Sequence, residues 1–85
     1  MIIRFNRHAM KRLIWRSCLI GMDPEEAFIR INETISEGRI SRTKHSKRNK
    51  IYYRYYHDNF SFFVFVHKQK KFWIIKTIII ERGRK

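Results

Sequence analysis

Hydrophobic residues in the first half of the chain recur with the period of an α-helix. Between residues 7 and 20, the apolar side chains that share one arc of a helical wheel are Ala9, Met10, Leu13, Ile14 and Ile20. Asn6 precedes this arc and is a favourable N-cap, and Gly21 follows it and can end a helix in the left-handed conformation. The pattern predicts a first helix over residues 7–20, preceded by a short edge strand in residues 1–5.

The stretch DPEEAFIRINETISEG has the clearest local signal for a second helix. Asp23 is an N-cap, Pro24 takes the first helical position and Glu26 completes a capping box. The predicted buried stripe consists of Ala27, Phe28, Ile31 and Ile35. Gly38 closes the helix.

After Gly38 the pattern is typical of strands. RISRTK is a weak edge-strand candidate and HSKRNK a basic loop, whereas IYYRYYH, FSFFVFVH and FWIIKTIII predict three antiparallel strands. This order predicts an α+β fold, with two N-terminal helices packed on one face of a three- to five-stranded, mainly antiparallel sheet. We expect a single domain over residues 1–85, with a charged tail at 81–85.

The turns set which side chains share a face of this sheet. A two-residue turn at 58–59 places Tyr55 opposite Phe62, and a four-residue turn at 68–71 places Phe62 opposite Thr77. Because side chains alternate along a strand, one face becomes the core under the helices. That face is expected to hold Ile51, Tyr53, Tyr55, Phe62, Val64, Trp73, Ile75, Thr77 and Ile79. The solvent face is expected to hold Tyr52, Arg54, Tyr56, Phe63, Phe65 and Lys76.

The charge of the chain indicates the kind of partner. Twenty Lys and Arg residues against seven acids give a formal net charge of +13, and five of those acids lie in the second helix and its cap. Such an excess favours a polyanion, with nucleic acid first and an anionic membrane surface second. Exposed aromatic rings beside cations suit RNA, and the predicted nucleic-acid contacts are Arg16, Tyr52, Arg54, Tyr56 and Lys76. The alternative is that these rings only fill the pleats of the sheet.

Other features of the sequence bear on its location. No stretch has the roughly 20 apolar residues that span a bilayer, and no signal peptide is visible. Cys18 is the one cysteine, which fits a reducing compartment. We therefore expect a cytoplasmic protein that does not bind a membrane.

The distribution of reactive side chains narrows the chemistry. We see no convergent carboxylates, no zinc-ligand spacing and no glycine-rich phosphate loop, so the sequence predicts no metal and no cofactor. Metal-free RNA cleavage needs only proton transfer and positive charge, because the ribose 2′-hydroxyl attacks the neighbouring phosphate. His8 lies four residues before Arg12, and an adjacent guanidinium favours the neutral imidazole of a general base. The alternative is an ordinary surface histidine.

Three further histidines leave the assignment open. His57 and His67 end predicted strands and can serve the same role as His8. His45, in the basic loop, is expected to be solvated or to contact a phosphate. In the last strand, Lys76 and Thr77 interrupt an apolar run. Solvent exposure would explain the lysine, and ordinary strand packing would explain the threonine.

The motif HAMKRLIWR, the capped second helix, the tyrosine-rich hairpin and the closing IIKTIII resemble a family of small toxin-like proteins. Their pattern is His-Ala-x-x-Arg-[Met/Leu]-x-x-Arg, and the family resembles a branch of the RelE/ParE/BrnT toxin superfamily of toxin–antitoxin modules. The resemblance implies a RelE-like domain with metal-independent endoribonuclease activity, restrained by an antitoxin that we expect to be acidic. It assigns His8, Arg12 and Thr77 to the catalytic site and adds Arg16.

Two departures qualify this resemblance, and two other functions compete with it. Many RelE-like toxins end in a helix with a functional residue, whereas this chain stops after its last strand; ParE-like members inhibit gyrase instead of cutting RNA. The first competing function is a non-catalytic basic nucleic-acid-binding protein. The second is an interaction protein whose basic surface pairs with an acidic partner. A homodimer is a further option that the sequence leaves open.

Overall fold

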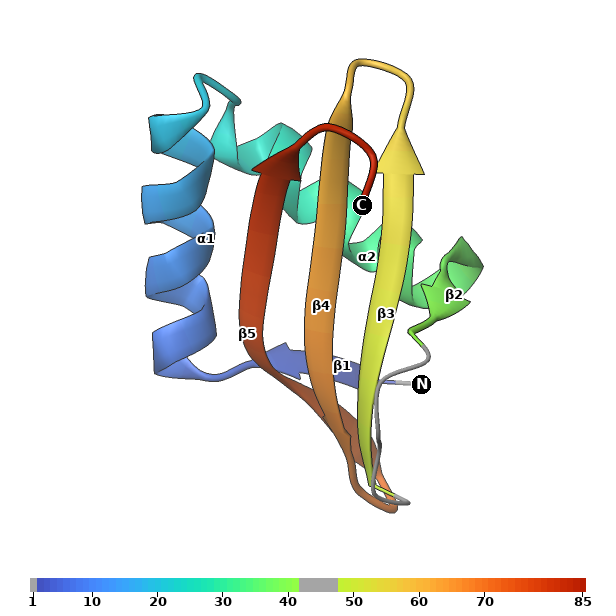
Figure 1. Ribbon diagram of the computed structural model, residues 1–85. Coiled ribbons are helices and arrows are strands. Elements are labelled where there is room, and N and C mark those ends of the chain that lie inside the picture. Colours follow the sequence, from blue (N-terminus) through green and yellow to red (C-terminus); the bar gives the residue numbers. More distant parts are fainter. Residues whose placement is uncertain (1, 42–47) are drawn as a thin grey trace.

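The computed structural model describes residues 2–41 and 48–85, which build two helices against a five-stranded sheet (Figure 1). The elements are β1 (Ile2–Phe5), α1 (Arg7–Leu19), α2 (Pro24–Glu37), β2 (Arg39–Ile40), β3 (Asn49–Tyr56), β4 (Phe60–Lys68) and β5 (Phe72–Arg82). The strand order is β1-β5-β4-β3-β2. The predicted α+β fold is confirmed, although β1 precedes the helices and runs parallel to β5, so the sheet is mixed. His45 and the first half of the predicted basic loop, residues 45–47, lie outside the described residues, whereas its last two residues, Asn49 and Lys50, already belong to β3.

Both helices begin at the caps that the sequence indicates. The Asn6 side chain accepts a hydrogen bond from the backbone N–H of Ala9 (2.7 Å), and Asp23 accepts one from the N–H of Glu25 (2.8 Å). The expected capping box does not form, because the Glu26 carboxylate accepts a hydrogen bond from Arg30 instead. No helix in the described ranges is long and apolar enough to cross a membrane.

The core lies between the helices and one face of the sheet. Helix α1 packs along β5, and α2 crosses behind β3 and β4 (Figure 1). The buried apolar residues are Ala9, Leu13, Ala27, Ile31, Ile35, Tyr52, Phe62, Val64, Val66, Ile75, Ile78 and Ile80. Three residues of the predicted stripes stay exposed: Met10, Ile14 and Phe28. The Phe28 ring stacks on Phe5 with the ring centroids 5.4 Å apart.

The hairpin between β3 and β4 has a three-residue loop instead of the expected two-residue turn. Tyr56 pairs with Phe60, and Asn59 takes the left-handed conformation (φ 73°) while its N–H donates to the Tyr56 carbonyl at 2.9 Å. Arg54 therefore lies opposite Phe62, so the predicted register of β3 was wrong by one residue. A slip of one residue exchanges the two faces of a strand.

The side chains of β3 consequently point the other way from the prediction. Tyr52, Arg54 and Tyr56 face the helices, whereas Tyr53 and Tyr55 face away from them. The prediction that the first three lie in solvent and the last two in the core is wrong on both counts.

A β-bulge shifts the pairing of β4 with β5 as well. Phe65 pairs with Thr77 and Val66 with Ile75, which leaves Lys76 as the extra residue. Ile75 and Ile78 are thus both fully buried, and Lys76 is exposed. The predicted pairing of Phe62 with Thr77 was wrong, since Phe62 lies opposite Ile80. Thr77 and Ile79 lie on the face away from the helices.

Gly38 allows a close approach between the end of α2 and β3. A Cβ atom at this position would lie 2.3 Å from the carbonyl oxygen of Thr34 and 2.7 Å from that of Tyr53. Its backbone conformation (φ −76°) suits any residue, so the constraint is one of space.

We predict that Gly38→Ala lowers the free energy of unfolding by about 3 kcal/mol, because the methyl group would overlap two backbone carbonyls. The matched control is Gly21→Ala, which meets open space but has φ +72° and should lose about 1 kcal/mol. Urea unfolding followed by circular dichroism measures both. If Gly38→Ala proves no more destabilising than Gly21→Ala, the close approach does not exist.

Candidate nucleic-acid interface

One face of the sheet carries a row of aromatic side chains that neither helix covers. We call it the open face; its members from β3, β4 and β5 are Ile51, Tyr53, Tyr55, Phe63, Phe65, Thr77 and Ile79. All of them are partly exposed. The rings of Tyr53 and Phe63 lie 4.9 Å apart and tilted, as adjacent cross-strand aromatics do.

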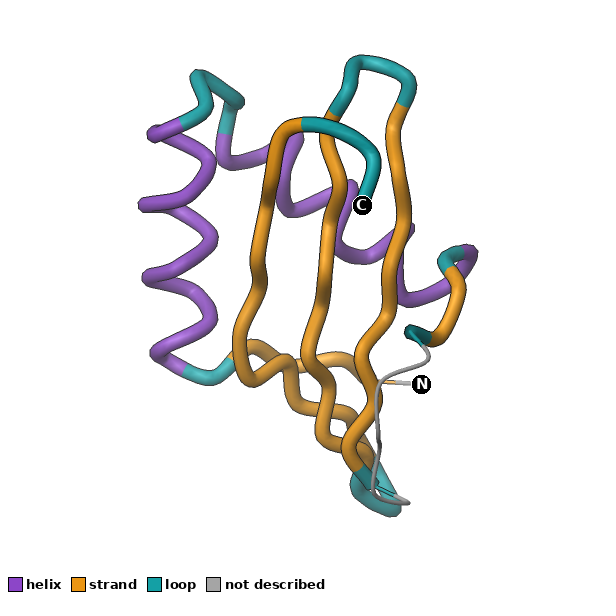
Figure 2. The backbone as a smooth tube through the Cα atoms, viewed as in Figure 1, coloured by secondary structure: helices purple, strands orange, loops and turns teal. Residues whose placement is uncertain are grey.

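The C-terminal residues fold back over one end of the open face (Figure 2). The N–H of Gly83 donates to the carbonyl of Asn59 at 2.8 Å, and the hydroxyl of Ser61 donates to the Gly83 carbonyl. Beyond this anchor, the guanidinium of Arg84 lies 4.9 Å from the centre of the Tyr55 ring. The predicted charged tail thus adds cations to the open face.

A pocket of about 330 Å³ opens beside the β-bulge. Its lining combines Ile51 and Phe65 with Lys76 and Thr77, and it also includes Lys50, which pairs with the core residue Val66. We call it the bulge pocket. Rings or aliphatic groups flanked by cations are what an unstacked base and its phosphates require.

A second pocket, of about 450 Å³, lies at the edge of β3 beside the first residue of β2. Strand β2 pairs only with Tyr52 and Tyr53, so the following part of β3 is not paired to it. We call this the edge pocket; it is lined by Glu37, Gly38, Arg39, Tyr53, Arg54, Tyr55, Arg84 and Lys85. It joins the open face through its two tyrosines.

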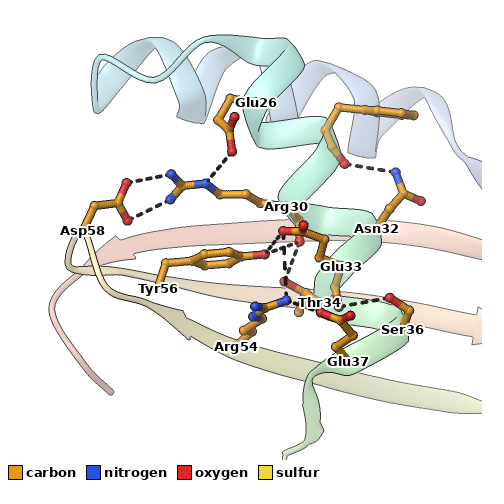
Figure 3. A network of polar contacts seen from close by, with 11 residues as sticks. Glu26, Arg30, Asn32, Glu33, Thr34, Ser36, Glu37, Arg54, Tyr56 and Asp58 are labelled. Atoms are coloured by element: carbon orange, nitrogen blue, oxygen red, sulfur yellow. Dashed lines mark hydrogen bonds and ion pairs between the residues drawn. The ribbon is translucent and has the colours of Figure 1, made fainter.

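Behind the sheet, Arg30 is the centre of a polar network between α2 and the β3–β4 turn (Figure 3). Its guanidinium donates two hydrogen bonds to the Asp58 carboxylate, at 2.8 and 2.7 Å, and one to Glu26 at 2.9 Å. It also lies over the Tyr56 ring at 4.6 Å. The hydrogen bonds from Arg30 hold the pKa of Asp58 below its ordinary value.

Two residues that we predicted to contact RNA, Arg54 and Tyr56, belong to the same polar network. Arg54 donates to Glu37 at 2.7 Å, and the Tyr56 hydroxyl donates to the Glu33 carboxylate at 2.8 Å (Figure 3). Burial, reinforced by the bond to Glu33, raises the pKa of Tyr56 to about 12. The prediction that both side chains lie on a solvent face was wrong, because the hairpin register turns them toward α2.

Tyr52 is also misplaced by the predicted register. Its side chain is only 6% exposed, and its ring stacks against Trp73 with centroids 6.2 Å apart. It belongs to the core, so a base cannot stack on it.

The predicted catalytic residues lie on adjoining elements but make no joint contact. His8 is exposed in the first turn of α1, and Arg12 on the same helix directs its guanidinium to the Trp15 ring at 5.4 Å. Thr77 lies on β5, against which α1 packs, and lines the bulge pocket. Within the described ranges, no hydrogen bond or ion pair links the three.

The other predicted residues take separate positions. Arg16 is half-buried on α1, and its enclosed Nε atom has no hydrogen-bond partner among residues 2–41 and 48–85. Lys76 is exposed at the bulge, as expected. His57 is exposed, whereas the Nδ1 of His67 lies 2.8 Å from the side-chain oxygen of Asn49.

The sequence reasoning missed Tyr53 and Tyr55. The signal that could have found them is Asn59, since asparagine is one of the few residues that tolerates the left-handed conformation of a three-residue hairpin loop. Reading the loop as 57–59 places both tyrosines on the open face.

Neither a metal-binding cluster nor a similarity to known proteins identifies the function of this site. No group of three His, Cys, Asp or Glu side chains in the described part of the chain could hold a metal ion. No family model, curated protein or solved structure matches this chain. The resemblance to toxins remains a prediction, and the site is argued from its own residues.

We predict that Asp58→Asn lowers the free energy of unfolding by about 1 kcal/mol at pH 7, the upper range for exposed ion pairs, because the contact is bidentate. The native pKa of Asp58 lies below its ordinary value of 3.8, so its contribution is complete above that pH. It disappears as the pH falls through the native pKa, and the difference from wild type should vanish there. Urea unfolding between pH 2 and pH 7 measures this.

The matched control for Asp58→Asn is Glu25→Gln, which removes an exposed carboxylate of α2 outside this network. It should change the unfolding free energy by less than about 0.5 kcal/mol. A constant deficit of Asp58→Asn across the pH range would show that charge pairing with Arg30 is not its cause.

Proposed function

We propose that this protein binds single-stranded RNA along its open face. The observation that carries the proposal is the row of aromatic side chains on an uncovered sheet surface, with cations at both ends. Splayed bases stack on Tyr53, Phe63 and Phe65, and each such contact contributes about 1–3 kcal/mol. Lys76 and the tail cations neutralise phosphates, and a duplex cannot present unstacked bases to the same surface.

The distribution of charge supports this orientation. Five of the seven acids belong to α2 and its cap, on the helix side of the sheet. Of the other two, Asp58 is paired with Arg30, and Glu81 lies 3.6 Å from the ammonium of Lys85. The negative charge is therefore gathered behind the sheet or compensated, which favours a polyanion on the open face.

We predict that the double variant Tyr53→Leu/Phe63→Leu binds a labelled U12 oligonucleotide at least tenfold more weakly than wild type, as measured by fluorescence anisotropy. Leucine keeps the apolar character of both positions and removes the ring faces. The control is Phe28→Leu, which removes an aromatic ring, 44% exposed, from the helix side and should bind like wild type. Equal weakening by both variants, or a wild-type preference for a duplex, would contradict the proposal.

A second candidate function is metal-independent cleavage of the bound RNA. The observation that favours it is that His8 and Arg12 lie on α1, which packs along β5. Thr77 belongs to the same strand, where it faces away from the helices and lines the bulge pocket. His8 is the candidate general base for the 2′-hydroxyl, and Arg12 the candidate charge beside the phosphate. The resemblance to toxins implies the same reaction and an acidic antitoxin as partner.

We predict that His8→Ala reduces cleavage of total RNA in the presence of EDTA at least a hundredfold, in line with the loss of a general base. Arg12→Ala should reduce it similarly, because the positive charge at the phosphate is lost. The control is His57→Ala, an exposed histidine at the hairpin turn. Wild-type cleavage by both α1 variants removes them from the site, and RNA binding without cut products leaves the binding function alone.

A further inference from the structure

We infer that the edge pocket binds the terminal phosphate of an RNA strand. The inference deepens the proposed function and rests on it, since the strand is the one that lies on the open face. It names a phosphate monoester as the group recognised and the end of the strand as its source.

Four cations from three separate segments line this pocket. They are Arg39 from β2, Arg54 from β3, and Arg84 and Lys85 from the C-terminal residues. Like charges brought together in a compact fold destabilise it unless counter-charges are present.

Acids compensate only two of these four charges. Arg54 is paired with Glu37 at 2.7 Å, and Lys85 lies 3.6 Å from Glu81. Arg39 and Arg84 have no ion pair within the described residues. The one carboxylate in the lining, that of Glu37, is paired with Arg54, so Arg39 and Arg84 line the pocket without a counter-charge of their own. A bound anion relieves this arrangement.

The pocket is also held in shape before any ligand arrives. Arg84 lies over the Tyr55 ring, and the Tyr55 hydroxyl donates to the side chain of Asn59 at 3.0 Å. The backbone N–H of Lys85 lies 3.3 Å from the Tyr53 hydroxyl. A guanidinium fixed against a ring loses little freedom when it binds, so its hydrogen bonds to a phosphate act at nearly full strength.

The terminal phosphate of an RNA strand matches two unpaired arginines better than an internal phosphodiester does. An internal phosphodiester has one negative charge, whereas a phosphate monoester has about −1.5 to −2 at neutral pH and three acceptor oxygens. Each arginine can donate two parallel hydrogen bonds to such a group. The volume of about 450 Å³ lies within the range of small-ligand sites, about 300–1,000 Å³.

The location of the pocket fits a strand end as well. It lies at the edge of the sheet and joins the open face through Tyr53 and Tyr55. A strand that crosses the aromatic rings towards β2 ends at this edge. Either a 5′-phosphate or a 3′-phosphate presents the required group there, and the two are separated by experiment.

The test compares three internally labelled U8 oligonucleotides, with no terminal phosphate, with a 5′-phosphate or with a 3′-phosphate, by fluorescence anisotropy at fixed ionic strength. We expect one phosphorylated strand to bind about tenfold more tightly than the unphosphorylated strand, as hydrogen bonds to a charged group allow. This advantage should be lost in Arg39→Gln and in Arg84→Gln. It should persist in Arg7→Gln, which removes an equal charge from α1, outside the pocket; circular dichroism verifies that each variant is folded.

Each contrary outcome has a distinct meaning. Equal binding of all three strands to wild type, or an advantage that survives in both pocket variants, overturns the inference and leaves the proposed function standing. If none of the strands binds, the proposed function fails and the inference fails with it. If inorganic phosphate competes as strongly as the phosphorylated strand, the pocket is a site for free phosphate, and the assignment to a strand end is wrong.

Discussion

The three-residue loop between β3 and β4 is the constraint on which the rest of this structure depends. Its left-handed Asn59 sets the register that turns Tyr53 and Tyr55 to the open face and Arg54 and Tyr56 to the helix side. One residue less in the loop would invert the whole strand. The bidentate contact from Arg30 to Asp58 fastens this loop to α2, so the helix and the hairpin specify the same register independently.

This register also decides where the charges of the molecule are compensated. With Arg54 turned inward, it meets Glu37, while Arg30 meets Asp58 and Glu26. Three of the seven acids, Glu33, Glu37 and Asp58, thus stabilise the contact of α2 with the sheet and its hairpin turn. Lys76 of β5 and Arg84 of the C-terminal residues are left on the opposite side, where Tyr55 and the other exposed rings are. A single local feature of the backbone therefore separates a structural polar network from a surface suited to a polyanion.

The helices and strands could be predicted from the sequence more accurately than the register in which the strands pair. Caps at Asn6 and Asp23 and most of the apolar stripes of both helices could be predicted, because they follow from local hydrogen bonding and helical period. Met10, Ile14 and Phe28 of those stripes are exposed. The choice between a two- and a three-residue loop could not be made from alternation, since both strands carry apolar or aromatic residues on both of their faces. Tyr52 and Tyr56 were therefore assigned to solvent, although Phe63, Phe65 and Lys76 were assigned to it correctly.

The candidate catalytic residues show a different limit of sequence reasoning. The spacing of His8 and Arg12 predicts that they share a side of α1, and they do, but spacing says nothing of what their side chains contact. Arg12 lies over the neighbouring Trp15 ring, which is a cation–π contact available within one helix. A strand on the open face would have to draw Arg12 from this ring before the guanidinium could reach a phosphate.

The bulge in β5 links the packing of the core to the open face. Without an extra residue, strict alternation from Ile75 would send Thr77 inward and Ile78 outward. The bulge at Lys76 instead allows both Ile75 and Ile78 to be fully buried, and it sends Thr77 to the open face. Lys76, which has no partner in the pairing of β4 with β5, is an exposed cation that lines the bulge pocket. The distortion that completes the hydrophobic core thus also forms one of the two cationic pockets, so that loss of the bulge would alter stability and the binding surface together.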